Sequence, residues 1–238
     1  MGKTAQLACY HSKREIDVLS MTKYRAVLFD LDGTLLDTLE DIADAANRVL
    51  ASRGFPTRAL DIHRAAVGSG ARQLMERVLP ETNRDPETIQ DCFAAFRKDY
   101  GEHWDIKTKP YMGVPEMLDA LQARGLKMAV LSNKPADFTR KCVYGILSKW
   151  KFDPVIGAED GIPNKPDPAG ALDISKQLEI PPNGFVYLGD TGVDMKTANA
   201  AGMFAVGALW GFRGRQELEK DGAKVLLKRP QSLLSLFD

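Results

Sequence analysis

Short apolar runs alternate with amphipathic stretches along much of this chain. Ala26–Phe29 is apolar at every position and is followed at once by polar residues. Runs of the same kind occur at residues 127–131, 184–189, 204–206 and 225–227. Such runs are typical of strands buried on both faces of a parallel sheet. Segment 152–157 is a weaker run, and its Pro154 favours an edge position.

Helical spacing fills most of the gaps between these runs. Helices are predicted at residues 114–124, 136–147 and 169–178, and a fourth runs through Asn199 and stops at Gly202. Strands that alternate with helices in this way form right-handed βαβ units. The pattern therefore predicts an α/β fold built on a doubly wound parallel sheet.

Residues 38–108 interrupt this alternation with consecutive helices and no convincing strand. Predicted helices cover residues 38–50, 59–66, 71–79 and 86–100. We therefore expect a small all-helical unit, residues 38–108, inserted into an α/β core made of residues 21–37 and 109–238. Residues 1–20 lack a continuous apolar run, so we expect an N-terminal extension from an upstream start or an added leader, not a secretory signal.

Composition narrows the classes of partner. The chain has 238 residues, 44% of them hydrophobic, which is ample for a packed core. Lys+Arg and Asp+Glu both number 32, so no net charge attracts nucleic acid or an anionic membrane. No apolar run approaches the roughly 18 residues of a membrane span. Cys9, Cys92 and Cys142 are widely spaced and fit reduced thiols. We expect a soluble cytoplasmic protein, monomeric or homodimeric.

Two carboxylates follow the first apolar run directly. If the backbone stays extended, Asp30 and Asp32 point to the same side, and Gly33 then permits a sharp turn. Paired carboxylates repel each other, so a cation or a shared proton is needed to keep them together. The alternative is an ordinary aspartate-rich turn after a buried strand.

Polar residues also follow two other predicted strands. Ser132 and Asn133 end the second, Asp190 and Asp194 follow the run 184–189, and Lys165 lies between them. The carboxyl ends of parallel strands share one edge of the sheet, so these groups are expected to meet. Excess carboxylates suit a hard divalent cation, with Mg²⁺ the first choice. A hydroxyl, a lysine and backbone amides suit phosphoryl oxygens, which predicts metal-assisted phosphoryl transfer.

Four segments carry a family resemblance. Asp30-x-Asp32-Gly33-Thr34-Leu35, Leu131-Ser132-Asn133-Lys134, Asn164-Lys165-Pro166-x-Pro168 and Gly189-Asp190-x-x-x-Asp194 resemble, in order, the motifs of the haloacid dehalogenase-like (HAD) hydrolases. Segments 189–203 and 209–213 look most like the phosphoglycolate phosphatase branch. The resemblance implies a Rossmann-like core with a helical cap of the C1 type.

The resemblance also implies a role for each matched residue. Asp30 would attack phosphorus and become an aspartyl phosphate. Asp32 would protonate the leaving alcohol and later deprotonate water, a role worth about 10² to 10⁴ in rate. Asp30, the main-chain carbonyl of Asp32 and Asp190 would hold Mg²⁺, with Asp194 a ligand or a neighbour of the ligands. The expected phosphate-binding residues are Gly33, Thr34, Ser132, Asn133 and Lys165.

The helical insert is expected to close over the site. Its loop Gly68-Ser69-Gly70 is the candidate for facing the substrate, because glycines allow the backbone to approach a ligand closely. Arg72 is the candidate for binding a substrate carboxylate. The hinges are predicted near residues 37–38 and 109–113, and a cap of this size favours small substrates.

Several of these residues have simpler explanations. Ser132 and Thr34 could cap helices, and Lys165 could be a solvated loop residue. Asp194 lies at a predicted helix start, where the helix dipole favours an acidic residue in any case. Arg72 could be a solvated helix residue.

The preferred functional interpretation is a Mg²⁺-dependent phosphatase for a small phosphorylated metabolite, with 2-phosphoglycolate the leading candidate by resemblance. One alternative is a phosphosugar mutase, which uses the same aspartyl phosphate but returns the group to the sugar. A phosphate-accepting receiver domain is disfavoured, because such domains are about half this length and have no helical insert.

Overall fold

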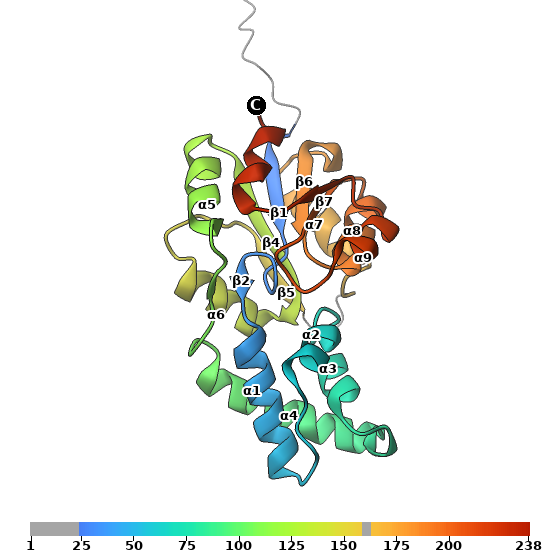
Figure 1. The fold of residues 1–238 in the computed structure, drawn as a ribbon. Coiled ribbons are helices and arrows are strands. Elements are labelled where there is room, and N and C mark those ends of the chain that lie inside the picture. Colours follow the sequence, from blue (N-terminus) through green and yellow to red (C-terminus); the bar gives the residue numbers. More distant parts are fainter. Residues whose placement is uncertain (1–23, 159–162) are drawn as a thin grey trace, which may run out of the picture.

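The fold is organised around a six-stranded parallel sheet (Figure 1). The computed structural model describes residues 24–158 and 163–238, so the extension expected at residues 1–20, with Cys9, lies outside the described residues. The strand order is β5 (Val155–Ala158), β4 (Lys127–Pro135), β1 (Ala26–Phe29), β6 (Phe185–Gly189), β7 (Phe204–Ala208) and β8 (Val225–Leu227). Every neighbouring pair is parallel, which confirms the predicted α/β class.

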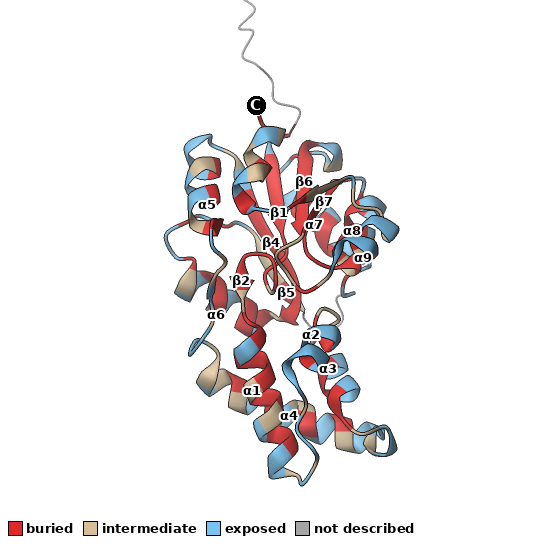
Figure 2. Ribbon diagram, viewed as in Figure 1, coloured by how far each residue is buried: buried red, intermediate tan, exposed pale blue. Residues whose placement is uncertain are grey.

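Strand β1 lies inside the sheet and contributes to both of its faces. Val27 and Phe29 belong to one apolar cluster, and Ala26 and Leu28 belong to the other. The helices of the first cluster are α5 (Val114–Ala123), α6 (Ala136–Ile146) and the 3₁₀ helix η3 (Pro230–Leu236). Those of the second are α7 (Ala169–Gln177), α8 (Gly192–Ala201) and α9 (Arg215–Lys220). Because both faces are covered, β1 is buried throughout (Figure 2), which explains its uninterrupted apolar run.

The strand bounds agree with the sequence pattern in most places. β5 is an edge strand, as Pro154 indicated. β4 is longer than expected and continues through Ser132 and Asn133 to Pro135, with a shift in register against β5 after Leu131. The short helix α9, the 3₁₀ helix η2 (Pro182–Gly184) and a two-stranded sheet were not expected, since such short elements leave no periodic pattern.

The helical insert packs around an apolar cluster of its own beyond the carboxyl ends of the strands (Figure 1). Its elements are α1 (Leu39–Ser52), α2 (Leu60–Ala66), α3 (Ala71–Val78), η1 (Glu81–Asn83) and α4 (Pro86–His103). Two aromatic residues of the core, Phe138 and Phe212, extend into this cluster. No helix in the described part of the chain combines the length and the apolarity that a bilayer crossing requires.

The chain leaves the core and returns to it through one small antiparallel sheet. Strand β2 (Leu36–Asp37) pairs with β3 (Lys109–Pro110) at the two places where hinges were expected. Asp41, in the first turn of α1, is buried and accepts hydrogen bonds from the backbone amides of Lys107 (2.9 Å) and Thr108 (2.8 Å). The two crossings are therefore held side by side.

A second contact between core and insert comes from the loop after β7. The Arg213 guanidinium donates hydrogen bonds to the backbone carbonyls of Arg64 (2.5 Å), Ala65 (3.0 Å) and Val67 (2.7 Å), at the end of α2. Because those carbonyls have no partner within the helix, one core side chain secures the insert at this point.

Candidate active site

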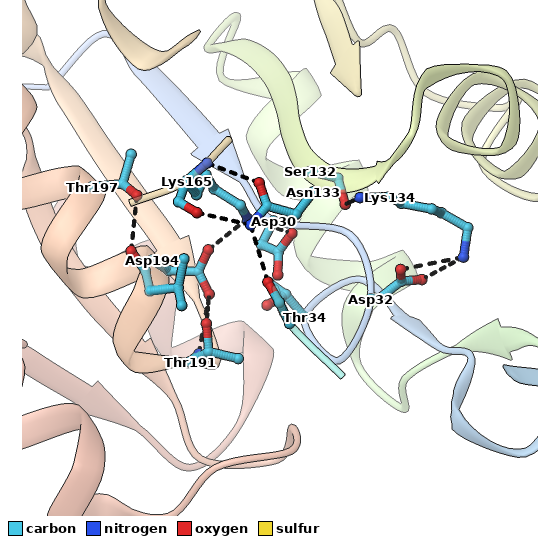
Figure 3. A network of polar contacts seen from close by, with 12 residues as sticks. Asp30, Asp32, Thr34, Ser132, Asn133, Lys134, Lys165, Thr191, Asp194 and Thr197 are labelled. Carbon is cyan, nitrogen blue, oxygen red and sulfur yellow. Dashed lines mark hydrogen bonds and ion pairs between the residues drawn. The ribbon is translucent and has the colours of Figure 1, made fainter. Parts of the chain in front are cut away.

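Three buried carboxylates meet at the carboxyl ends of β1 and β6. Figure 3 labels two of them, Asp30 and Asp194. Asp30 follows β1, Asp190 follows β6, and Asp194 lies in the first turn of α8. Each offers an oxygen within 4.8 Å of the others, although the three residues come from distant parts of the sequence. The predicted convergence of strand ends therefore holds for all three residues.

Lys165 lies directly against this cluster. Its Nζ is 2.8 Å from Asp30 Oδ1 and 2.7 Å from Asp194 Oδ1, and only 3% of its side chain is exposed. Burial by itself would lower the pKa of Lys165, but the two carboxylates outweigh it and raise the pKa well above its ordinary value. Lys165 is thus a buried ammonium, and the alternative of a solvated loop lysine is wrong.

The cluster carries more negative charge than Lys165 can neutralise. Burial, then repulsion from Asp194, raises the pKa of Asp30 to about 7, with Lys165 opposing the shift. Burial and the charges of Asp30 and Asp194 likewise raise the pKa of Asp190 well above its ordinary value. Carboxylates crowded in this way fit a hard divalent cation, which binds oxygen ligands and relieves their repulsion.

Asp190 is oriented by two hydrogen bonds. Thr34 Oγ1 donates to its Oδ1 (3.0 Å), and the backbone amide of Phe212 donates to its Oδ2 (2.7 Å). Thr34 was expected at the phosphate or at a helix cap, and the structure instead directs its hydroxyl at Asp190. Gly33 has a φ of 86°, and a Cβ there would collide with the Asp190 carboxylate, so only glycine fits. Its amide donates to Leu36 O within the turn (2.9 Å).

Asp194 uses its two oxygens differently. Oδ2 accepts hydrogen bonds from the amide (3.1 Å) and the hydroxyl (2.7 Å) of Thr191, which forms a capping box at the start of α8. Oδ1 faces Lys165 and the carboxylate cluster. The helix-start explanation and the site explanation therefore both apply to this residue, through different atoms.

Ser132 and Asn133 both reach the site from β4. Ser132 lines the same cavity as Asp30, and no side chain in the described part of the chain caps α6, so the helix-cap alternative for Ser132 is wrong. The side chain of Asn133 accepts a hydrogen bond from Lys165 N (2.8 Å) and donates to Lys165 O (3.0 Å). The same amide donates to Gly68 O (3.1 Å) in the insert. Asn133 therefore positions both the lysine loop and the loop of the insert.

A cavity separates the core from the helical insert. Its core wall consists of Asp30, Asp32, Ser132, Asn133, Lys134, Pro135 and Phe138. Its other wall consists of Ile42, Val67, Gly68, Gly70, Ala71, Leu74, Phe96 and Tyr100. Most side chains on this second wall are apolar, whereas the catalytic candidates line the first.

The expected substrate loop is only partly at this cavity. Gly68 and Gly70 line it, as predicted, but Ser69 and Arg72 are not among its lining residues. Arg72 is exposed on α3 and donates a hydrogen bond to Gln90 Oε1 of α4 (2.6 Å). Ser69 Oγ accepts one from Arg77 (3.1 Å). Both side chains thus have partners within the insert, and the solvated alternative for Arg72 fits the structure better.

The sequence did not single out two residues of the cavity. Lys134 Nζ lies 3.0 and 3.2 Å from the two Asp32 oxygens, and 2.8 Å from Tyr100 Oη (Figure 3 shows Lys134 and Asp32). The sequence does contain an indication for Lys134, because this residue directly follows Ser132 and Asn133 in the second motif. Tyr100 gave none, since its spacing in α4 marks only a packed position.

With this geometry in place, comparison with known proteins identifies the class. A family model named Haloacid dehalogenase-like hydrolase matches residues 27–208, and the chain belongs to that family. Among its relatives is the phosphoglycolate phosphatase of Aquifex aeolicus (strain VF5), 34% identical over 214 residues that span 90% of this chain and 97% of that protein. The phosphoglycolate phosphatase of Thiobacillus denitrificans is 34% identical over 201 residues, which span 83% of this chain and 88% of that protein.

Solved structures agree on the fold. A crystal structure from Haemophilus somnus 129pt superposes with a TM-score of 0.85 at 24% identity, over 92% of this chain and 100% of that chain. One from Lactobacillus delbrueckii subsp. bulgaricus gives a TM-score of 0.82 at 28% identity, over 90% of this chain and 99% of that one. The resemblance noted from four short motifs therefore extends over nearly the whole described fold.

Proposed function

We propose that this protein is a Mg²⁺-dependent phosphatase that hydrolyses a small phosphate monoester through an aspartyl-phosphate intermediate. The observation that carries the proposal is the placement of Asp30, a buried carboxylate that faces the cavity and forms an ion pair with Lys165. Asp32, a second carboxylate, lines the same cavity. The names of the curated relatives support phosphate monoesters as the substrate class.

In the proposed reaction a carboxylate oxygen of Asp30 attacks phosphorus. The bond from phosphorus to the alcohol oxygen breaks as the bond to Asp30 forms, and Asp32 gives its proton to the leaving oxygen. Asp32 then takes a proton from water, which attacks the aspartyl phosphate and releases inorganic phosphate. Lys165 and Ser132 hold the oxygens of the transferring group, and a buried ammonium is well suited to that charge.

Mg²⁺ would be held by the carboxylates of Asp30, Asp190 and Asp194, with the main-chain carbonyl of Asp32 completing the protein ligands. The excess of buried carboxylates over Lys165 supports this assignment. When bound, the ion supplies positive charge close to the phosphoryl oxygens. Thr34 and Asn133 act indirectly, because they hold Asp190 and the Lys165 loop in place.

In this proposal residues 38–108 form a cap, and residues 21–37 and 109–238 form the catalytic core. The paired strands β2 and β3 lie at the boundary, where a hinge is expected. Closure of the cap excludes bulk water from the cavity and limits the size of the substrate. Among small esters, 2-phosphoglycolate is the leading candidate, because the relatives of similar length carry that name.

The proposal is tested by phosphate release. Purified protein should release inorganic phosphate from p-nitrophenyl phosphate and 2-phosphoglycolate over many turnovers. A chelator should abolish release and Mg²⁺ should restore it, and Asp30→Asn should abolish turnover without unfolding the protein. Isomer formation without phosphate release would indicate a mutase, and one retained phosphate per chain would indicate a receiver. Full activity in excess chelator would remove the metal from the mechanism.

A further inference from the structure

The wall that the insert contributes to the cavity contains very few groups that can bind a polar leaving group. On the wall formed by the insert, the side chains of Ile42, Leu74 and Phe96 are apolar, and Tyr100 alone offers a hydroxyl among the described residues of that wall. Lys134 is the only basic side chain among the described residues on either wall. Among these lining residues, recognition of a negative charge on the alcohol part of a substrate therefore depends on Lys134.

Lys134 is held in a defined place between core and insert. Its side chain comes from β4 and is only 4% exposed. Its Nζ contacts both oxygens of Asp32, donates to Tyr100 Oη of α4, and lies 4.6 Å from the centre of the Tyr100 ring. The ammonium is therefore fixed beside the carboxylate that acts on the leaving oxygen.

This position requires Lys134 to exchange partners during the reaction. In the structure both Asp32 oxygens contact Lys134, so Asp32 has to release that contact when it turns toward the leaving oxygen. A buried ammonium without an anionic partner is costly. A carboxylate one carbon away from the leaving oxygen would lie next to Lys134 and provide the replacement partner. An uncharged leaving group would not.

We propose that Lys134, supported by Tyr100, determines specificity by binding a carboxylate on the leaving alcohol. The inference rests on the proposed phosphatase function and deepens it, because it names the side chains that would select the carboxylate of a phosphate ester of a short hydroxy acid. The apolar wall of the insert adds a second restriction. It would leave most hydroxyls of a sugar phosphate without hydrogen-bond partners, which disfavours sugar phosphates.

The test compares two esters that share a two-carbon chain, 2-phosphoglycolate and ethyl phosphate, which lacks the carboxylate. The measured quantity is the ratio of their kcat/KM values. Wild type should prefer 2-phosphoglycolate, and Lys134→Met should lower the ratio by about 30-fold or more, as expected for one partner of a buried charge pair. Lys134→Arg keeps the charge and should retain a preference. Lys141→Met, at an exposed lysine of α6, is the matched control and should leave the ratio unchanged.

The ratio separates specificity from general damage. Misplacement of Asp32 lowers turnover of both esters alike, whereas loss of a carboxylate partner lowers only one. If Lys134→Met does not fold, Tyr100→Phe carries the test, with a smaller decrease in the same direction. The inference would be overturned if the ratio of kcat/KM values is unchanged in the folded variants, or if Arg72→Met abolishes the preference for 2-phosphoglycolate instead. A wild-type preference for ethyl phosphate would also overturn it and leave the phosphatase proposal intact. No phosphate release from either ester would refute the phosphatase proposal itself.

Discussion

Replacement of Lys165 by methionine tests the charge balance of the site. Lys165 is the only ammonium that contacts the three-carboxylate cluster among the described residues, and its side chain is 3% exposed. Removing one partner of a buried ion pair costs about 3–5 kcal/mol of stability, because the other charge remains buried without compensation. The free energy of unfolding of metal-free Lys165→Met should therefore fall by about that amount.

Two conditions should reduce this loss. Mg²⁺ should reduce the difference in the free energy of unfolding between the variant and wild type. In the variant the ion replaces the missing positive charge and no longer competes with Lys165. Lower pH should also reduce this difference in the free energy of unfolding. The pKa of folded Asp30 is already raised from 3.8 to about 7, so the folded state binds the proton more tightly than the unfolded state. Stability from this group therefore increases as pH falls through 7 toward 3.8, and without Lys165 the increase should be steeper.

The assay is urea unfolding followed by circular dichroism, with and without Mg²⁺, at about pH 8 and about pH 6. Lys134→Met is the matched control, because it removes another buried lysine whose carboxylate partner, Asp32, lies outside the cluster. Its loss of stability should respond less to Mg²⁺ than that of Lys165→Met, because the Asp32 carboxylate is not one of the three clustered carboxylates. The reasoning is refuted if metal-free Lys165→Met is as stable as wild type, or if Mg²⁺ affects both variants equally.

Three further predictions concern the insert. Arg213→Ala removes the hydrogen bonds to the end of α2 and should raise KM about tenfold, which corresponds to a loss of about 1.4 kcal/mol of contact between the core and the insert. Arg215→Ala, at an exposed arginine, should leave KM unchanged, and equal KM values for the two variants would contradict the prediction. Asp41→Asn should lower the free energy of unfolding by about 1–3 kcal/mol, since an amide cannot accept all the hinge hydrogen bonds. Asp44→Asn loses only a partly exposed ion pair with Lys107 and should have little effect. Burial lowers the pKa of His63, whose Nδ1 has no hydrogen-bond partner among the described residues, so its contribution to stability is complete above about pH 6.5 and decreases below it. His63→Gln should therefore show a weaker loss of stability between about pH 7.5 and about pH 5.5 in urea unfolding, and an identical loss would refute the assignment.

Much of the fold follows from the sequence because buried elements leave clear patterns. The apolar run of β1 is uninterrupted since helices cover both of its faces, and the insert is recognisable from helical spacing without strands. The short β2–β3 pair could not be predicted in this way, because its stability comes from contacts such as those of Asp41 with the returning chain.

The site was predictable to the extent that strand ends determine it. Asp30, Asp190 and Lys165 meet because the strands are parallel and their carboxyl ends share an edge. The partners of Arg72 and Lys134 depend on how the insert sits over the core, which no local pattern specifies. Arg72 consequently lies on the outer side of α3, whereas Lys134 takes the place beside Asp32.

The most direct test of the central claim is to trap the phosphorylated nucleophile. Enzyme mixed briefly with substrate and Mg²⁺ would be quenched in acid, digested and examined by mass spectrometry. The proposed mechanism predicts one phosphoryl group on the peptide that contains Asp30, and none in Asp30→Asn. Sustained phosphate release by Asp30→Asn, or a phosphoryl group on a different residue, would contradict the mechanism.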